Sequence, residues 1–176
     1  NGETSSFTTT QKEEAKHFLE KLPPYPLDIS VAAYYLKATH VSYAAYLKNL
    51  TQNNKDFASI QENLLKDAGS YTKTRYSILT LSLQHLINTH KDFMDLLLFI
   101  SLLDSQNILR DLLDKYKNNL VVDNFIYNLK KYSLIMDKSS LASLEPTISV
   151  HRSTQAITLE YLKKLLGLEK DKKAIQ

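Results

Sequence analysis

The chain has 176 residues, of which 43% are hydrophobic, and it carries 22 Lys and Arg against 19 Asp and Glu, for a net charge of +3. This composition is typical of a globular protein with one domain or two small ones, and it excludes an intrinsically disordered chain. The absence of Cys excludes disulfides, thiol catalysis and Cys-ligated metal sites. It also favours a reducing compartment, so we expect a cytoplasmic protein.

Two further classes of segment are not expected. The chain has only three glycines, and their spacing fits neither a Walker-type loop nor a dinucleotide-binding Gly-rich turn. The longest apolar run, Phe93 to Leu103, is interrupted by two polar residues and is shorter than the ~18 residues of a membrane span. We therefore expect no phosphate-cradling loop within this chain and no membrane partner.

The first 40 residues are predicted to form two helices. Thr10, with Glu13 three residues later, is typical of a capping box and predicts a helix to about residue 22. Pro26 takes the first position of a second helix, which continues to about residue 39, and Asp28 complements the positive end of that helix. This second helix is indicated by apolar and aromatic residues at helical spacing, namely Leu27, Val31, Tyr34, Tyr35 and Ala38, and we expect the tyrosines to pack at the edge of the core.

The next segment contains the predicted domain boundary. Ser42 caps a third helix, and a fourth is predicted from about Lys55 to Lys66. The tripeptide at residues 68–70, with Gly69 followed by Ser70, interrupts the helical pattern. We predict that one domain ends and the next begins there, and that this point acts as a hinge.

The C-terminal part begins with helices and then changes period. Two consecutive helices are predicted between residues 73 and 104, followed by two short amphipathic helices at 107–117 and 121–132. Short β-like runs at 133–138 and 147–151 predict a hairpin. A last helix begins at about Ser153, with a predicted buried stripe of Ile157, Tyr161, Leu165 and Leu168.

The predicted fold class follows from this order of elements. Short helices that lead into a two-stranded wing and a further helix are the outline of a winged helix. We predict an all-α protein with a small β-hairpin: a helical bundle domain at residues 1–69, followed by a winged-helix domain at residues 70–176.

Several segments resemble a known family when they are taken in order. Two segments resemble the helical domain of NB-ARC/STAND signalling ATPases. They are Lys-Leu-Pro-Pro-Tyr-Pro-Leu-Asp-Ile-Ser at residues 21–30 and Val-Ser-Tyr-Ala-Ala-Tyr-Leu at residues 41–47. Segments at 76–86, 96–103, 129–135 and 148–152 resemble the winged-helix domain of the same family, in a bacterial-type version. The resemblance covers about residues 11 to 166.

The resemblance implies a nucleotide site with two contributions from this chain. Pro26 falls on the proline that packs near the adenine in that family, and His151 falls on the histidine that contacts the β-phosphate in the inactive, ADP-bound state. Two residues depart from the family pattern: Pro24 replaces the Gly of the proline motif, and Arg152 follows the histidine where Asp is frequent.

The resemblance also implies partners. The family's nucleotide-binding domain, with its phosphate loop, is expected before residue 1, and a repeat or sensor domain is expected after the last residue. The implied function is regulatory: the chain closes over ADP or ATP held by the upstream domain and controls signalling or assembly, with a homo-oligomer of the full protein as one expected form. The chain alone is expected to bind no cofactor and to catalyse no reaction.

A different class of function is the alternative, namely a stand-alone winged-helix module that binds protein or DNA. The helix at 121–132 would be the reading head for DNA. Between Asp104 and Lys138 there are six basic and five acidic residues, and such a balance makes a poor phosphate-binding surface. Nucleic acid is therefore an unexpected partner.

Side-chain chemistry gives no competing site. The four histidines other than His151 lie on separate predicted elements, and none has the close pair spacing of a metal site on one helix face. The sequence has no local signature of a nucleophile with its base or of paired catalytic carboxylates. No metal ligand and no catalytic residue is predicted.

Overall fold

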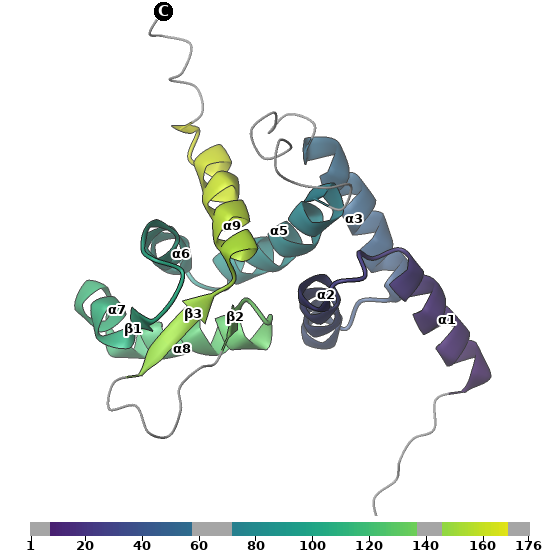
Figure 1. The fold of residues 1–176 in the computed structure, drawn as a ribbon, viewed down its shortest axis with the longest axis horizontal. Helices are drawn as coiled ribbons and strands as arrows, with labels where there is room; N and C mark the ends of the chain where they lie inside the picture. Colours follow the sequence, from purple (N-terminus) through teal and green to yellow (C-terminus); the bar gives the residue numbers. More distant parts are fainter. Residues whose placement is uncertain (1–7, 58–71, 137–145, 169–176) are drawn as a thin grey trace, which may run out of the picture. The chain divides into compact units, whose positions relative to one another are not determined.

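The structure is a computed structural model, and it describes residues 8–57, 72–136 and 146–168 (Figure 1). The chain divides into two units, residues 1–77 and 78–176, each with its own core. The division falls within a helix, α5 (Thr72–Thr89). The boundary that we predicted at Gly69 and Ser70 lies outside the described residues, and so does most of the helix predicted from Lys55 to Lys66.

The first unit is helical. It contains α1 (Thr9–Glu20), α2 (Pro26–Thr39), α3 (Tyr43–Phe57) and the first residues of α5. Helices α1 and α3 pack against each other. Where these two helices meet, the ring of Phe18 stacks on Tyr43 with 4.8 Å between ring centroids and lies 5.7 Å from Tyr46. Aromatic packing of this kind lets a short helical unit bury a large apolar area.

The helix ends in the first unit follow from local chemistry, with one correction. The capping box of α1 is made by Thr8 and Gln11, which exchange side-chain and backbone hydrogen bonds, and not by Thr10 and Glu13 as predicted. Thr8 has the extended backbone that a capping residue requires, whereas Thr10 is already helical. The predicted cap at Ser42 is confirmed, since its Oγ accepts a hydrogen bond from the backbone N–H of Ala45.

The second unit combines helices with a small sheet. Its elements are the remainder of α5, then α6 (Phe93–Leu102), β1 (Ile108–Leu109), α7 (Arg110–Tyr116), α8 (Asn119–Lys131), β2 (Ile135–Met136), β3 (Thr147–Val150) and α9 (Arg152–Leu165). The predicted fold class, mostly helical with a small β element, is confirmed.

The sheet of the second unit is antiparallel, with strand order β1-β3-β2. Ile135 lies opposite Val150 in the predicted hairpin, and Ile108 lies opposite Ile148 in a pairing that we did not predict. Residues 108 and 109 were predicted to be helical, but they pair with β3, and the helix starts at Arg110. In chain order the unit therefore runs helix, helix, strand, two helices, two strands and a last helix.

Helix α9 closes the second unit by packing along α6 (Figure 1). The side-chain amide of Gln155 donates hydrogen bonds to the carbonyls of Ile100 and Leu103, which are left without helical partners at the end of α6. The predicted stripe is only partly correct: Ile157 is buried, whereas Leu165 at the end of α9 and Leu168 after it are exposed. Among the described residues, no helix is both long and apolar enough to cross a bilayer.

Candidate functional site

The loop before α2 presents Pro26, the first of the two predicted site residues. Pro26 is exposed and takes the first position of α2, as predicted. Its ring holds φ near the helical value, and it lacks the N–H that the first turn of a helix would leave unpaired. Tyr25, before it, is extended with φ −113° and ψ 139°, as a residue preceding proline requires.

Behind this loop lies the buried ion pair of the first unit. Asp28 is fully buried in the first turn of α2, and the guanidinium of Arg75 on α5 donates hydrogen bonds to both of its carboxylate oxygens. The Arg75 Nε lies 2.9 Å from Oδ1 and 3.1 Å from Oδ2, and Nη2 lies 2.6 Å from Oδ2. The hydrogen bonds that Arg75 donates to Asp28 raise the pKa of Arg75 above its usual value. A buried carboxylate is tolerated only with such a partner.

A buried tyrosine lies near this ion pair. Tyr46 is fully buried, and within the described part of the chain its hydroxyl has no hydrogen-bond partner. Burial raises the pKa of Tyr46, and the neighbouring Tyr35 and Asp28 raise it further. The phenol therefore stays neutral over the whole physiological range, and its role is to fill the core beside Tyr35, whose ring centroid is 5.3 Å away.

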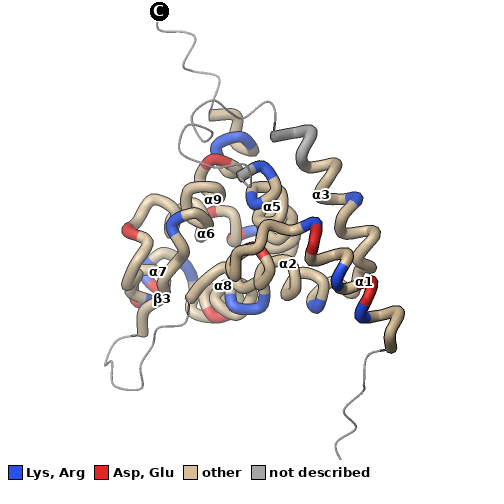
Figure 2. Tube along the Cα trace, turned by 45° about the vertical axis from the view of Figure 1, so that its right-hand side comes forward, with Lys and Arg blue, Asp and Glu red and all other residues tan. Residues whose placement is uncertain are grey.

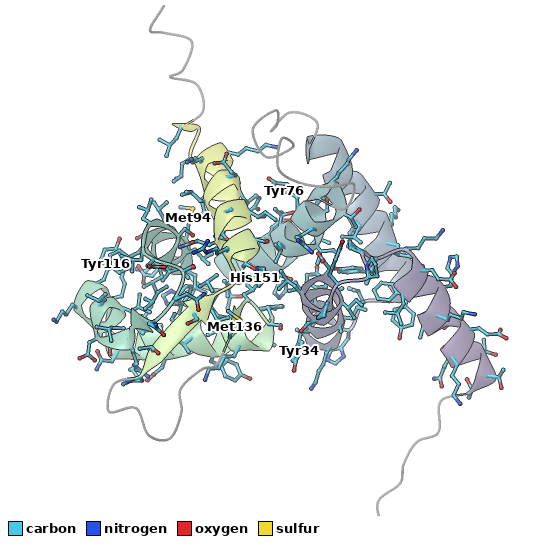
Figure 3. All side chains as sticks on the ribbon, in the orientation of Figure 1. Tyr34, Tyr76, Met94, Tyr116, Met136 and His151 are labelled. Atoms are coloured by element: carbon cyan, nitrogen blue, oxygen red, sulfur yellow. The ribbon has the colours of Figure 1, made fainter. Side chains whose placement is uncertain are left out.

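His151, the second predicted site residue, lies where β3 meets α9 (Figure 3). It is exposed and is the N-cap of α9: its Nδ1 accepts a hydrogen bond of 3.2 Å from the backbone N–H of Ser153. A neutral imidazole that accepts at Nδ1 carries its proton on Nε2, so the outer edge of the ring is a hydrogen-bond donor. Arg152, also exposed, follows directly and adds a positive charge at the positive end of the helix dipole.

The structure assigns the two predicted residues to different units. Pro26 belongs to the first unit and His151 to the second. Sequence reasoning missed Arg75, because no local pattern links it to Asp28, which is 47 residues away along the chain. It also missed the capping role of His151, because His is not one of the residues that usually cap helices.

The outer surface of α8 was the predicted reading head of the DNA-binding alternative. Arg110 at the start of α7 forms ion pairs with Asp114 and with Asp123 on α8, so it is already neutralised. Basic and acidic positions both occur on α7 and α8 (Figure 2). Two large apolar or aromatic side chains of α8 are also exposed: Leu120 is 78% exposed and Tyr127 is 64% exposed.

Lys117 is neutralised in the same way as Arg110. Its Nζ lies 3.0 Å from a carboxylate oxygen of Asp92 and 3.0 Å from one of Asp95. The hydrogen bond from Lys117 lowers the pKa of Asp92, and hydrogen bonds to Asp92 and Asp95 raise the pKa of Lys117. Two of the basic residues counted for a DNA surface, Arg110 and Lys117, therefore already have acidic partners within the unit.

A pocket of about 620 Å³ lies in the first unit, and Pro26 is not among the residues that line it. It is bordered by α1, the end of α2 and the start of α3, and it is lined by Glu14, His17, Phe18, Leu36, Val41, Ser42, Tyr43, Ala44 and Leu47. Sequence reasoning gave no sign of it, because its apolar members have the spacing of ordinary core residues. In the described part of the chain, no group of three or more His, Asp or Glu side chains is arranged to hold a metal ion.

Comparison of the chain with protein-family models, with curated proteins and with solved structures gives no match. What bears on function is therefore the chemistry and geometry of this chain's own residues.

Proposed function

We propose that the chain is the regulatory part of a STAND/NB-ARC-type molecular switch, in which a helical unit and a winged-helix unit close over a nucleotide. An upstream domain holds ADP or ATP by its phosphates, and this chain supplies contacts from the side. Exchange of ADP for ATP moves the winged-helix unit and exposes a surface for signalling or assembly, which is a hinge type of two-state change.

The observation that carries the proposal is the exposure and hydrogen bonding of the His151 side chain. The side chain is exposed, its Nδ1 is occupied by the backbone of α9, and its donor edge is directed away from that contact. A group of this kind is suited to the β-phosphate of ADP, because phosphate oxygens only accept hydrogen bonds. The exposed Pro26, at the end of a loop rich in proline, supports the accompanying contact with adenine.

The remaining parts of the proposal follow from the chemistry that this chain carries. It has no Gly-rich phosphate loop of its own, so ADP or ATP binds only together with the upstream domain, and this chain catalyses nothing by itself. Its partners are that domain, a downstream repeat or sensor domain, and further copies of the full protein in a cytoplasmic assembly. Reading the gene upstream of residue 1 is the simplest test, and the absence of a phosphate loop there would overturn the proposal.

Replacing His151 in the full-length protein should accelerate release of ADP. Loss of one charge-assisted hydrogen bond costs about 1.5–3 kcal/mol, which corresponds to a rate increase of about 10- to 100-fold. The rate can be measured by stopped-flow displacement of a fluorescent ADP. Because the contact exists only in the closed, ADP-bound state, the same variant should also assemble more readily.

Two variants separate this contact from the capping role of His151. Asn is a good N-cap but is too short to reach a phosphate held by the imidazole, so both His151→Ala and His151→Asn should release ADP faster. An effect confined to His151→Ala would assign His151 to capping alone. His17→Ala, which changes an exposed histidine of α1, is the control and should leave the rate unchanged.

The alternative function is a winged-helix module that binds a partner through α8, and the exposed Leu120 and Tyr127 favour a protein partner over DNA. We expect the chain to show no salt-sensitive binding to duplex DNA, because the N-terminal part of α8 presents Leu120 and the acidic Asp123. A gel-shift titration with random-sequence duplexes at about 50 mM salt measures this. Retardation at submicromolar protein that disappears at higher salt would favour the DNA-binding alternative.

A further inference from the structure

The loop that carries Pro26 is held rigid almost entirely by its own residues. We take this loop as residues 23–26. Three of its four residues, Pro23, Pro24 and Pro26, have φ fixed by their rings. Tyr25 is the exception, and its backbone is tied on both sides: its N–H donates to the carbonyl of Pro23 at 2.8 Å, and its carbonyl accepts from Ile29 at 3.1 Å. The side chain of Tyr25 is the remaining part of the loop whose orientation another element must set.

Arg75 is the residue that contacts both sides of this loop. Its guanidinium carbon lies 5.2 Å from the ring centroid of Tyr25, the residue before Pro26. Its guanidinium nitrogens bind the buried carboxylate of Asp28, two residues after Pro26. One planar group on α5 therefore restrains the chain on each side of Pro26. The planar shape matters, because only a flat guanidinium can form a fork with a carboxylate and also lie against an aromatic ring.

We propose that Arg75 is a positioning residue that orients Tyr25 and Pro26 to receive a purine base. The proposal rests on the proposed function and extends it from Pro26 to the residues that set its geometry. Tyr25 is 45% exposed as a residue, and Pro26 beside it is exposed, so together they can present an apolar surface of the kind on which a heteroaromatic base packs. Arg75 acts through these two residues and does not itself touch the phosphates.

The test compares Arg75→Lys with the parent in the full-length protein. Lys keeps a positive charge opposite Asp28 but loses both the fork and the planar contact with Tyr25. We expect the dissociation constant for ADP to rise about tenfold, while that for inorganic pyrophosphate, which has no base, stays unchanged. Lys37→Gln is the matched control: it removes a cation whose Nζ lies 6.0 Å from the ring centroid of Tyr34 on α2, and it should alter neither constant.

The two probes distinguish positioning from general damage. Equal weakening of ADP and pyrophosphate binding, or no weakening of either, would overturn the role of Arg75 in base binding. If the parent protein binds pyrophosphate as tightly as ADP, Pro26 does not contact the adenine. That result would also overturn the proposed role of Arg75 in positioning Pro26 for the base.

A second measurement on the chain itself separates this proposal from the proposed function. Amide hydrogen exchange at Ile29, whose N–H bonds the Tyr25 carbonyl, should be about tenfold faster in Arg75→Lys. Exchange at Gln155, whose N–H bonds the His151 carbonyl in the other unit, should not change. Unchanged exchange at Ile29 would overturn the positioning role even if ADP binds as proposed, whereas faster exchange in a protein that does not bind ADP would refute the nucleotide function alone.

Discussion

Arg75→Met should destabilise the first unit by about 3–5 kcal/mol, since removal of one partner of a buried ion pair leaves the other charge buried and uncompensated. Asp28 is fully buried, and the three hydrogen bonds from Arg75 are its contacts with a positive charge. Met fills a similar volume, so the loss arises from charge and hydrogen bonding rather than from a cavity. An effect of this size is a large part of the stability of a small unit.

Urea denaturation of the chain, followed by far-ultraviolet circular dichroism, measures the loss. Because the chain has two units, the data are fitted with a separate unfolding transition for each. Amide exchange at Val31, in the core of the first unit, then identifies which unit has lost stability. The double variant Asp28→Leu with Arg75→Met replaces the pair by apolar groups and should recover most of the loss. A single variant within about 0.5 kcal/mol of the parent would show that the ion pair is not formed in solution.

Phe125→Ala should destabilise the second unit by about 3–5 kcal/mol, because the large side chain leaves a cavity that a well-packed core cannot close. Phe125 is fully buried on the inner face of α8, and its ring centroid is 5.3 Å from that of Phe93 on α6. The substitution therefore removes the aromatic contact that joins these two helices, and we expect this unit to be largely unfolded at physiological temperature.

Tyr127→Ala is the matched control for that prediction. It removes an aromatic side chain from the same helix, but at a position that is 64% exposed, and it should change stability by no more than about 0.5 kcal/mol. Thermal melting of the two variants beside the parent makes the comparison. A melting temperature for Phe125→Ala close to that of the parent would mean that α8 turns its other face to the core, as the DNA-binding alternative requires.

Much of the local structure could be predicted from local patterns. Apolar spacing predicted an amphipathic helix over residues 121–132 with Val122, Phe125, Ile126 and Leu129 on one face; in α8 three of these are buried and Ile126 is half-buried. The change to β-like runs predicted the pairing of β2 with β3. Pro26 was predicted at the first position of α2, where the structure has it. These features depend on neighbours within a few residues, and such information is present in the sequence itself.

Errors arose where local patterns allow more than one outcome. Helical spacing treated Tyr34 and Tyr35 alike, but Tyr35 is buried and Tyr34 beside it is 43% exposed. Helical periodicity locates the centre of a buried face well and its edges poorly, because the width of the face depends on what packs against it. The capping box of α1 was placed two residues late for a related reason, since Thr8 and Thr10 are both followed three residues later by a suitable partner.

Propensity, proline geometry and apolar period were enough to predict most of the described helices, the pairing of β2 with β3 and the place of Pro26 at the start of α2. The pairing of Asp28 with Arg75, and the strand in which Ile108 lies beside Ile148, became evident only in the folded chain. Both are contacts between residues some 40 or more positions apart, and a two-residue strand or a buried carboxylate is stable only once a distant partner is in place. The burial of the core carries the free energy that brings such partners together, and that burial is a property of the folded chain as a whole.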